Sequence, residues 1–420
     1  MDLQRQNTGT LAFLAEMQER GSVRQCTDLA GLDGALRAGD LTAYVGFDAT
    51  ADSLHVGHLV SLTAMKRLAA DGHRVIALLG GATTLVGDPS FRNATRPMLT
   101  ERQVEANIAG IRANIEAVMG EHSGRLSFVD NREWLGGVGM IDFMRSVGSH
   151  FTVARMLAME SVKGRLEAGN PMSMLEFSYM MLQAADFLEL SRRQGCVLQM
   201  GGSDQWGNIC NGIELARRAD GRELFGLTTP LLENAAGEKM GKTASGAVWL
   251  SPGRMSPFDF WQFWRNVDDA DVGRFLALFT DLPVAEAKRL GDVEGRALNE
   301  GKAELATLMT SMVHGEEQAA LAKRQAEGLF SGYAAGTTHE IEAEDGIGLL
   351  DALVTVGFAA TKGEARRLVR GDGVKLDGAT VSDEAARLPA RPEPYALWVG
   401  KRRRATLAVS CPAAEASPSP

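Results

Sequence analysis

Short apolar runs alternate with helical patterns along the first half of the chain. Residues 43–47, 75–79 and 196–200 are apolar runs of strand length, and residues 54–70 carry apolar positions at helical spacing. Strand–helix–strand alternation is typical of a parallel sheet covered by helices on both faces. We therefore predict an α/β fold built on a Rossmann-like parallel sheet.

The remaining pattern divides the chain into further parts. Residues 9–20 and 255–330 have helical periodicity, and residues 131–195 indicate a helical insertion in the sheet domain. Small and acidic residues after 330 indicate a linker. The predicted parts are a sheet domain at 1–228, an α-helical domain at 229–335, a linker at 336–346, a small α+β module at 347–411 and a disordered tail at 412–420.

Composition narrows the class of protein. The chain has 420 residues, of which 45% are hydrophobic and 23% charged, so it can bury a full core. No window approaches the ~18 consecutive apolar residues of a transmembrane helix, and the first residues lack the pattern of a secretory signal. The four Cys are scattered without a C-x-x-C pair, which favours reduced thiols, no zinc site and a cytoplasmic location.

Charge is distributed unevenly along the chain. Residues 361–410 contain 11 Lys or Arg and six Asp or Glu, a net +5 in a chain whose net charge is −9. A basic end on an acidic body is expected where one module contacts a polyanion. A solvated surface without a partner gives the same pattern, and charge alone does not decide between the two.

The pattern D-A-T-A-D-S-L-H-V-G-H, which ends at His58, follows a predicted strand and opens a predicted helix. Asp52 or Ser53 would cap that helix, and the N–H groups of a helix N-terminus suit phosphate. His55 and His58 would share one face, and Gly57 would let a flat base lie against the backbone. Two surface histidines beside a tolerated glycine are the alternative.

A second glycine-containing segment, G-E-K-M-G-K-T, begins at Gly237. Lys239 and Lys242 flank Gly241, so this loop could wrap and neutralise a leaving polyphosphate. It lacks the spacing of a P-loop, because Ala236 stands where that pattern needs Gly. An ordinary solvated turn is the alternative.

Taken together, H-V-G-H and K-M-G-K-T resemble the two signature motifs of class I aminoacyl-tRNA synthetases. The stretches G-G-A-T-T-L-V-G-D-P-S, E-F-S-Y-M-M-L-Q-A-A-D and G-G-S-D-Q-W-G-N are similar to those of bacterial tyrosyl-tRNA synthetases. The resemblance covers most of residues 35–410. It implies a tyrosine–tRNA ligase that forms tyrosyl-adenylate and pyrophosphate from tyrosine and ATP and then loads tRNA(Tyr).

Tyr179, Gln183 and Asp186 fall at i, i+4 and i+7, on one face of one predicted helix. Buried polar groups need partners, and an amino acid with a hydroxylated ring would supply them. An ordinary core helix with a buried network is the alternative. A site that bonds a substrate hydroxyl can reject the analogue lacking it by ~10⁴–10⁵-fold, so no editing domain would be needed.

The resemblance implies a role for each matching residue. The catalytic and phosphate-binding positions are Thr50, His55, His58, Lys239, Lys242, Thr243, Arg92 and Arg96. The tyrosine-binding positions are Tyr44, Thr83, Asp88, Asn131, Tyr179, Gln183, Asp186 and Gln205. The ATP-binding positions are Gly46, Asp48, His55, Gly57, His58, Gly202, Asp204 and Lys242. Within the second set, the resemblance puts Asp186 and Tyr44 on the phenolic hydroxyl, and Tyr179, Gln183 and Asp88 on the α-ammonium.

Two features of the sequence bear on the nucleotide-binding assignments. Solvated charge is the alternative for Arg92 and Arg96. Val45 stands where the family often has Cys, which removes a hydrogen bond to the ribose.

The implied chemistry needs no general base. The tyrosine carboxylate is already ionised at pH 7, so its in-line attack on the α-phosphorus of ATP needs positioning and charge stabilisation. Mg²⁺ is expected to arrive with ATP, without a dedicated protein cage. No organic cofactor is implied.

The basic end indicates RNA as a partner. Residues 361–370 predict a basic helix and residues 371–378 a turn, a short strand and a turn, similar to an RNA-binding module of a small-subunit ribosomal protein. Its predicted RNA-binding residues are Arg366, Arg367, Arg370 and Lys375. The implied partners are tRNA(Tyr), tyrosine, ATP and a second copy of the chain, with no membrane.

Three alternatives stay open. A tryptophanyl or other class I synthetase would share the signatures, although Asp186 with Tyr44 and the C-terminal module favour tyrosine. A non-enzymatic RNA-binding relative should have lost part of the phosphate-binding set. A small-molecule adenylyltransferase would not need residues 347–410.

Overall fold

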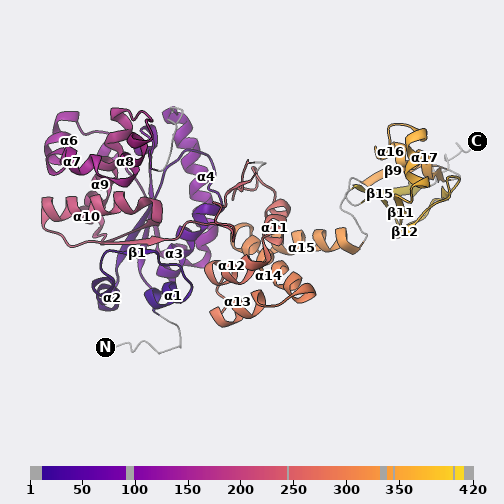
Figure 1. Cartoon of the computed structure of the whole chain (residues 1–420), viewed down its shortest axis with the longest axis horizontal. Helices are drawn as coiled ribbons and strands as arrows, with labels where there is room; N and C mark the ends of the chain where they lie inside the picture. The colour runs from indigo at the N-terminus through magenta and orange to yellow at the C-terminus, as the bar shows by residue number, and fades with distance from the viewer. Residues whose placement is uncertain are drawn as a thin grey trace, which may run out of the picture. The chain divides into compact units, whose positions relative to one another are not determined.

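The structure is a computed structural model that describes residues 12–90, 99–243, 246–331, 338–343, 346–400 and 403–410. The chain forms two compact units, residues 1–319 and 320–420. In Figure 1 the first unit runs from indigo to orange and the second from orange to yellow.

The first unit is built on a six-stranded sheet in the order β1-β6-β5-β2-β3-β4. Neighbours from β6 to β4 are parallel, and β1 pairs antiparallel with β6. The strands are β1 (Gln25–Cys26), β2 (Thr42–Phe47), β3 (Arg74–Leu79), β4 (Leu126–Asp130), β5 (Leu198–Gly202) and β6 (Phe225–Thr229). The predicted α/β fold is therefore confirmed, although β5 begins and ends two residues later than predicted.

The strand order reverses beside β2. The chain proceeds through β3 and β4 on one side of β2 and through β5 and β6 on the other. In open α/β sheets, ligands bind outside the carboxyl ends of the strands that flank such a reversal. The carboxyl ends of β2 and β5 therefore mark the expected site.

Helices cover this sheet because its central strands are buried and apolar. Those outside the β4–β5 connection are α1 (Phe13–Glu19), α2 (Leu29–Ala38), α3 (Leu59–Ala70), α4 (Glu101–Met119) and α10 (Trp206–Asp220). The connection itself forms α5 (Arg132–Leu135), α6 (Met140–Ser146), α7 (Val153–Leu157), α8 (Glu160–Glu167) and α9 (Met174–Gln194), and no strand. Figure 1 shows α6 to α9 as a group apart from α1, α2 and α3.

After β6, the chain forms a small two-stranded ribbon and then helices. The ribbon pairs β7 (Lys242–Thr243) with β8 (Gly246–Ala247). The helices are α11 (Pro257–Arg265), α12 (Val272–Phe279), α13 (Val284–Gly291), α14 (Gly295–His314) and α15 (Glu316–Ser331). Trp264 is buried among Phe260, Phe275 and Phe279 in edge-to-face contacts, which hold α11 and α12 together.

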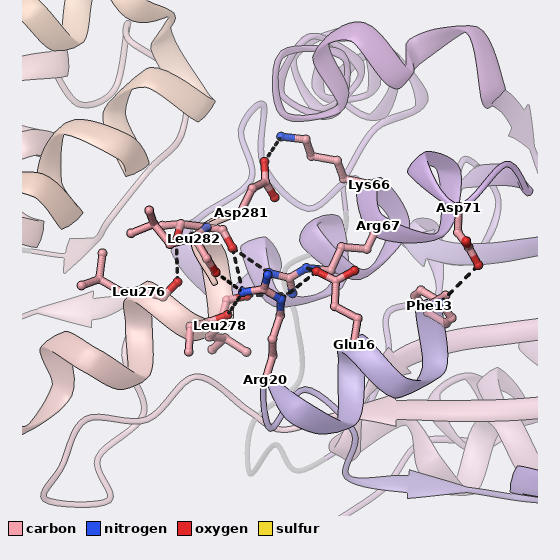
Figure 2. A network of polar contacts seen from close by, with 12 residues as sticks. Phe13, Glu16, Arg20, Lys66, Arg67, Asp71, Leu276, Leu278, Asp281 and Leu282 are labelled. Carbon is pink, nitrogen blue, oxygen red and sulfur yellow. Dashed lines mark hydrogen bonds and ion pairs between the residues drawn. The ribbon is translucent and has the colours of Figure 1, made fainter. Parts of the chain in front are cut away.

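Two buried arginines connect this helical part to the sheet part (Figure 2). Arg20, after α1, donates to three backbone carbonyl oxygens around the end of α12, and Arg67, on α3, donates to two, all at 2.9–3.1 Å. Both reach the carbonyl oxygen of Thr280, and both pair through Nε with Glu16. They satisfy carbonyl groups that a helix C-terminus leaves without intrahelical partners.

The second unit is a small α+β module. A five-stranded sheet has the order β12-β11-β14-β15-β9, and a separate pair joins β10 to β13. The elements are β9 (Thr338–Glu342), β10 (Ile347–Gly348), α16 (Leu349–Thr355), α17 (Lys362–Arg370), β11 (Val374–Leu376), β12 (Ala379–Thr380), β13 (Arg387–Leu388), β14 (Tyr395–Val399) and β15 (Arg403–Ser410). Its core joins both helices to the sheet through Leu353, Val369, Leu397 and Leu407.

The predicted linker at 336–346 is wrong in its centre. β9 lies inside it and pairs in parallel with β15. The strand is hard to see in the sequence because its partner lies more than 60 residues away and only Ile341 adds an apolar side chain to the core. The predicted tail at 412–420 lies outside the described residues, as do residues 9–11 of the first predicted helix, which is α1 in the structure.

Candidate active site

Residues from distant parts of the sequence meet at the carboxyl edge of the sheet. Asp48 follows β2, Asp204 and Gln205 follow β5, and Asn131 follows β4. The helix α9 adds its polar face, which starts at Tyr179. The site has two regions. The ring end is formed by Tyr44, Asn131, Trp134 and Asp186, and the phosphate end by His55, His58, Lys239 and Gly241.

At the ring end, Asp186 is 2% exposed and both of its oxygens accept hydrogen bonds. Asn131 Nδ2 donates to Oδ2 at 3.0 Å and Trp134 Nε1 donates to Oδ1 at 2.8 Å. Burial raises the pKa of Asp186 from 3.8 to about 7, although these two hydrogen bonds act in the opposite direction. The carboxyl group is thus held in one orientation and titrates near neutral pH.

The hydroxyl of Tyr44 completes the ring end. It is buried and has no hydrogen-bond partner among the described residues. Burial raises the pKa of Tyr44 well above 10, and the negative charge of Asp186 raises it further. Like the Tyr44 hydroxyl, Oε1 of Gln183 on α9 is buried and has no hydrogen-bond partner in the described chain. Buried polar groups of this kind are normally satisfied, so these two atoms indicate where a ligand would bind.

Between the two ends, Asp48 organises a second group of polar side chains. Tyr179 donates its hydroxyl to Oδ2 at 3.1 Å, and Thr83 donates to Oδ1 at 3.0 Å. Thr83 Oγ1 also accepts from Asn131 at 3.0 Å, which links Asp48 to the ring end. A Cβ on Gly80 would lie 2.5 Å from Asp48 Oδ1, so a glycine there leaves room for this carboxylate.

Two of the three residues predicted to bind the α-ammonium, Gln183 and Asp88, are joined through Gln205. Gln183 Nε2 donates to Gln205 Oε1 at 3.2 Å, and Gln205 Nε2 donates to Asp88 Oδ2 at 2.9 Å. Tyr179 contacts Asp48 rather than Asp88, although Asp88 lies near enough to raise its pKa. The tyrosine-binding residues predicted from the sequence are thus brought together.

His55 and His58 lie at the start of the helical segment, with ring centroids 4.1 Å apart. His55 Nδ1 accepts from the backbone N–H of Gly57 at 3.1 Å, and His58 Nδ1 accepts from that of His55 at 3.2 Å. A backbone N–H can only donate, so the ring of His55 carries its proton on Nε2, which is a donor. His58 Nδ1 also lies 3.3 Å from the carbonyl oxygen of His55, so its role as donor or acceptor depends on the tautomer. Burial and the neighbouring His55 lower the pKa of His58 to about 3, so His58 is neutral at pH 7.

The predicted helix cap at Asp52 or Ser53 is wrong. The helical segment begins as a 3₁₀ turn, η1 (Val56–His58), capped by His55, and α3 starts only after it. Residues 54–56 are extended because they pair with residues 248–250 through hydrogen bonds of 2.9 Å. This pairing with a distant segment overrides the local capping signal.

The same pairing brings the lysine loop against the histidines. A Cβ on Gly241 would lie 3.3 Å from Nδ1 of His55, and one on Gly57 would lie 2.8 Å from Cε1 of His55. Burial raises the pKa of Asp204 and the charge of Asp88 raises it further, while the exposed Lys239 lies near enough to offset part of that rise. The two signature segments, about 180 residues apart in sequence, therefore form one phosphate end.

The remaining predicted nucleotide-binding positions lie on the same edge. Gly46 is exposed on β2, and nothing lies within 4 Å of where its Cβ would be. Thr50 is exposed on the loop after β2. Gly202 ends β5 beside Asp204, whose Oδ1 would lie 2.6 Å from an added Cβ. Lys242 is placed by its backbone in β7, as is Thr243, whereas Arg92 and Arg96 lie outside the described residues.

Sequence reasoning missed Trp134. It lies three residues after Asn131 and provides the shorter of the two hydrogen bonds to Asp186. Its only signal is an aromatic N–H donor close behind a polar residue at the end of a strand, which is too common a pattern to single out.

The predicted RNA-binding residues lie in the second unit. Arg366, Arg367 and Arg370 are exposed on α17, and Lys375 is exposed on β11. The helix and the strand both lie where the sequence predicted them.

Two absences apply to the part of the chain that the structure describes. Its helices include none with the length and apolar content to span a membrane. Its His, Cys, Asp and Glu side chains form no group of three or more suited to a metal ion.

The fold and the site together define a class I tRNA synthetase, with both signature segments at the carboxyl edge of a parallel sheet. The family described as tRNA synthetases class I (W and Y) matches residues 36–331. Tyrosine–tRNA ligase of Pseudomonas aeruginosa (strain LESB58) is 50% identical over 397 residues, which are 93% of this chain and 96% of that protein. The chain therefore belongs to the tyrosine–tRNA ligase family of class I tRNA synthetases.

Other relatives agree with that assignment. Tyrosine–tRNA ligase of Rhodospirillum rubrum is 50% identical over 408 residues, 94% of this chain and 98% of that protein. Among solved structures, a C-terminally truncated mitochondrial tyrosyl-tRNA synthetase of Aspergillus nidulans matches with a TM-score of 0.69 and 28% identity, covering 77% of this chain and 95% of that one.

Proposed function

We propose that this protein activates L-tyrosine with ATP and transfers the tyrosyl group to tRNA(Tyr). The observation that carries the substrate is the ring end, where a hydrogen-bonded, buried carboxylate lies beside a buried hydroxyl that has no partner among the described residues. A phenolic hydroxyl bound there would donate to Asp186 and accept from Tyr44. An indole N–H could donate to Asp186 but offers no acceptor for Tyr44.

The first step is in-line substitution at the α-phosphorus. A carboxylate oxygen of tyrosine forms a bond to phosphorus while the bond to the bridging oxygen of the β-phosphate breaks, and pyrophosphate leaves. His55 donates from Nε2 to the departing phosphates, as do the hydroxyls of Thr50 and Thr243, and His58 contacts the ribose or its neighbouring phosphate. The charges of Lys239, Lys242, Arg92 and Arg96 neutralise the leaving group. Mg²⁺ enters with ATP as part of the substrate.

The second step transfers the tyrosyl group to RNA. A hydroxyl of the terminal adenosine of tRNA attacks the carbonyl carbon of the adenylate, and AMP leaves. The exposed cations of α17 and β11 would bind the phosphates of the tRNA. The four Cys are scattered along the sequence, and reduced thiols at these positions would be consistent with a cytoplasmic location.

Exchange of labelled pyrophosphate into ATP tests the first step. Exchange should depend on tyrosine, and tryptophan and phenylalanine should support it far more weakly. Exchange supported by tryptophan but not by tyrosine would overturn the substrate assignment. Exchange without transfer to tRNA would leave an adenylate-forming enzyme and overturn only the second step.

We also propose that the protein is a homodimer through the helical segment between β4 and β5. Of the 11 large hydrophobic residues that are exposed in the described chain, nine lie between residues 138 and 175, and Met140 is 78% exposed. Such a concentration is typical of an interface. Sedimentation velocity of the wild-type chain should show a dimer. The double variant Met140→Glu, Ile141→Glu should sediment as a monomer. A wild-type monomer at micromolar concentration would contradict the proposal.

A further inference from the structure

Two of the exposed arginines in the second unit share one carboxylate. Arg366 Nε lies 2.9 Å from Oε2 of Glu384, and Arg370 Nε donates to Oε1 of the same group. We propose that Glu384 is a positioning residue that orients Arg366 and Arg370 so that both guanidinium groups bind one RNA phosphate. This inference rests on the proposed RNA-binding role of the module.

The geometry leaves the outer nitrogen atoms of both guanidinium groups available. Arg366 and Arg370 are four residues apart on α17, so they are neighbours on one face. Their side chains are 47% and 68% exposed, and no contact besides that with Glu384 is found for either within the described chain. Because Glu384 contacts each guanidinium at Nε, the Nη groups can donate to another acceptor.

The buried arginine pair of the first unit shows what such an arrangement does when an acceptor is present. Arg20 and Arg67 also share one carboxylate, that of Glu16, through Nε. Their Nη groups then converge on the carbonyl oxygen of Thr280, each at 3.1 Å (Figure 2). The same architecture at α17 lacks such an oxygen among the described residues, and a phosphate oxygen is the acceptor that guanidinium groups fit best.

Electrostatics alone makes the opposite prediction. Glu384 is a negative charge on a surface proposed to bind a polyanion, so its removal should strengthen RNA binding. If positioning dominates, removal should weaken binding, because two adjacent arginines would repel each other and lose their common orientation. The sign of the change therefore separates the two roles.

The experiment compares the full-length wild-type chain with Glu384→Gln in binding tRNA(Tyr), measured by fluorescence anisotropy. We expect about fivefold weaker binding and a slope of log Kd against log salt reduced by about one, as for one lost phosphate contact. Glu393→Gln is the matched control. Glu393 is an exposed carboxylate of the same module, and its substitution removes the same charge. It should leave binding unchanged or slightly tighter. Unchanged or tighter binding by Glu384→Gln would overturn the proposal.

Two further variants separate this proposal from the function on which it rests. Arg366→Gln with Arg370→Gln should weaken binding at least as much as Glu384→Gln, and adding Glu384→Gln to that pair should have no further effect. Glu384→Asp should restore part of the wild-type affinity. If the double arginine variant binds normally, the RNA-binding face itself is wrong. If it binds weakly while Glu384→Gln binds normally, only the positioning role is wrong. Tyrosine-dependent exchange without tRNA reports that the first unit of each variant is intact, and an unchanged thermal unfolding profile reports that the second unit is folded.

Discussion

At the ring end of the site, Asp186 is almost fully buried and its two oxygens are held by Asn131 and Trp134. At the phosphate end, Lys239 is exposed in an isolated bridge with Glu233. The loop that carries it meets His55 because residues 248–250, which follow the loop, pair with residues 54–56. Side chains that are already hydrogen-bonded before substrate arrives can discriminate between substrates. An exposed cation beside a donor histidine can stabilise the negative charge that develops on a leaving phosphate.

Under the proposed function, the difference assigns specificity to one end and rate to the other. A buried polar group that loses its substrate partner costs free energy, so the ring end penalises the wrong amino acid. The phosphate end contacts parts of ATP that are the same for every amino acid, so it cannot contribute to that choice. Changes at the two ends should therefore affect different kinetic quantities.

The largest expected effect is at the ring end. Asp186→Asn should lower the ratio of kcat/KM for tyrosine over phenylalanine by about 10³, because the amide lacks the negative charge and one of the two acceptor oxygens of the carboxylate. Pyrophosphate exchange with each amino acid measures the ratio. Asp292→Asn, which changes an exposed carboxylate at the end of α13, is the control and should leave the ratio unchanged. An equal loss for both amino acids in Asp186→Asn would show that Asp186 does not read the hydroxyl.

The corresponding change at the phosphate end should affect rate alone. Lys239→Ala should slow adenylate formation by about 10²-fold, since one charge-stabilising donor is lost in the transition state. Tyrosine affinity should stay within about twofold, because Lys239 lies at the other end. Single-turnover kinetics and equilibrium binding measure the two quantities separately. Lys288→Ala, which removes an exposed lysine on α13, is the control. Equal losses of rate and tyrosine affinity in Lys239→Ala would show that the two ends do not have separate roles.

The sequence predicted the polar face of α9 better than the backbone conformation around His55, and the reason is physical. Tyr179, Gln183 and Asp186 share a face because helical periodicity is local, and the predicted helix is α9. His55 is extended rather than helical because residues 248–250 pair with it, and no local pattern encodes that contact. β9 was missed for the same reason, since its pairing partner β15 lies far along the chain. Trp134 was missed because only the fold reveals that its N–H meets a buried carboxylate.

The pH dependence of tyrosine binding can sharpen the comparison. The pKa of Asp186 is raised to about 7 by burial, so the carboxylate that accepts the phenolic hydroxyl forms as pH rises through 7. Tyrosine affinity should therefore increase about tenfold from pH 6 to pH 8, whereas phenylalanine affinity should not change. His58 does not titrate in this range because its pKa is about 3. Calorimetric titrations at several pH values provide the measurement, and a flat profile for tyrosine would show that the ionised form is not required.

The same raised pKa has a consequence for the free protein. Between pH 4 and pH 7 the folded chain holds a proton at Asp186 that the unfolded chain has released. This contribution to the free energy of unfolding is fully present below about pH 4 and is lost as pH rises through 7. Stability and tyrosine binding therefore depend on pH in opposite directions at this residue.

The smallest expected effect tests how the ring end holds its carboxylate. Trp134→Phe keeps an aromatic ring but removes the donor to Asp186 Oδ1, so tyrosine affinity at pH 8 should fall about fivefold. The pKa of Asp186 should rise, because one hydrogen bond that stabilises its charged form is lost. The midpoint of the pH profile for tyrosine should accordingly move above 7, whereas a structural defect without that role would lower affinity equally at every pH. An unchanged midpoint would leave Asn131 as the residue that controls the charge of Asp186.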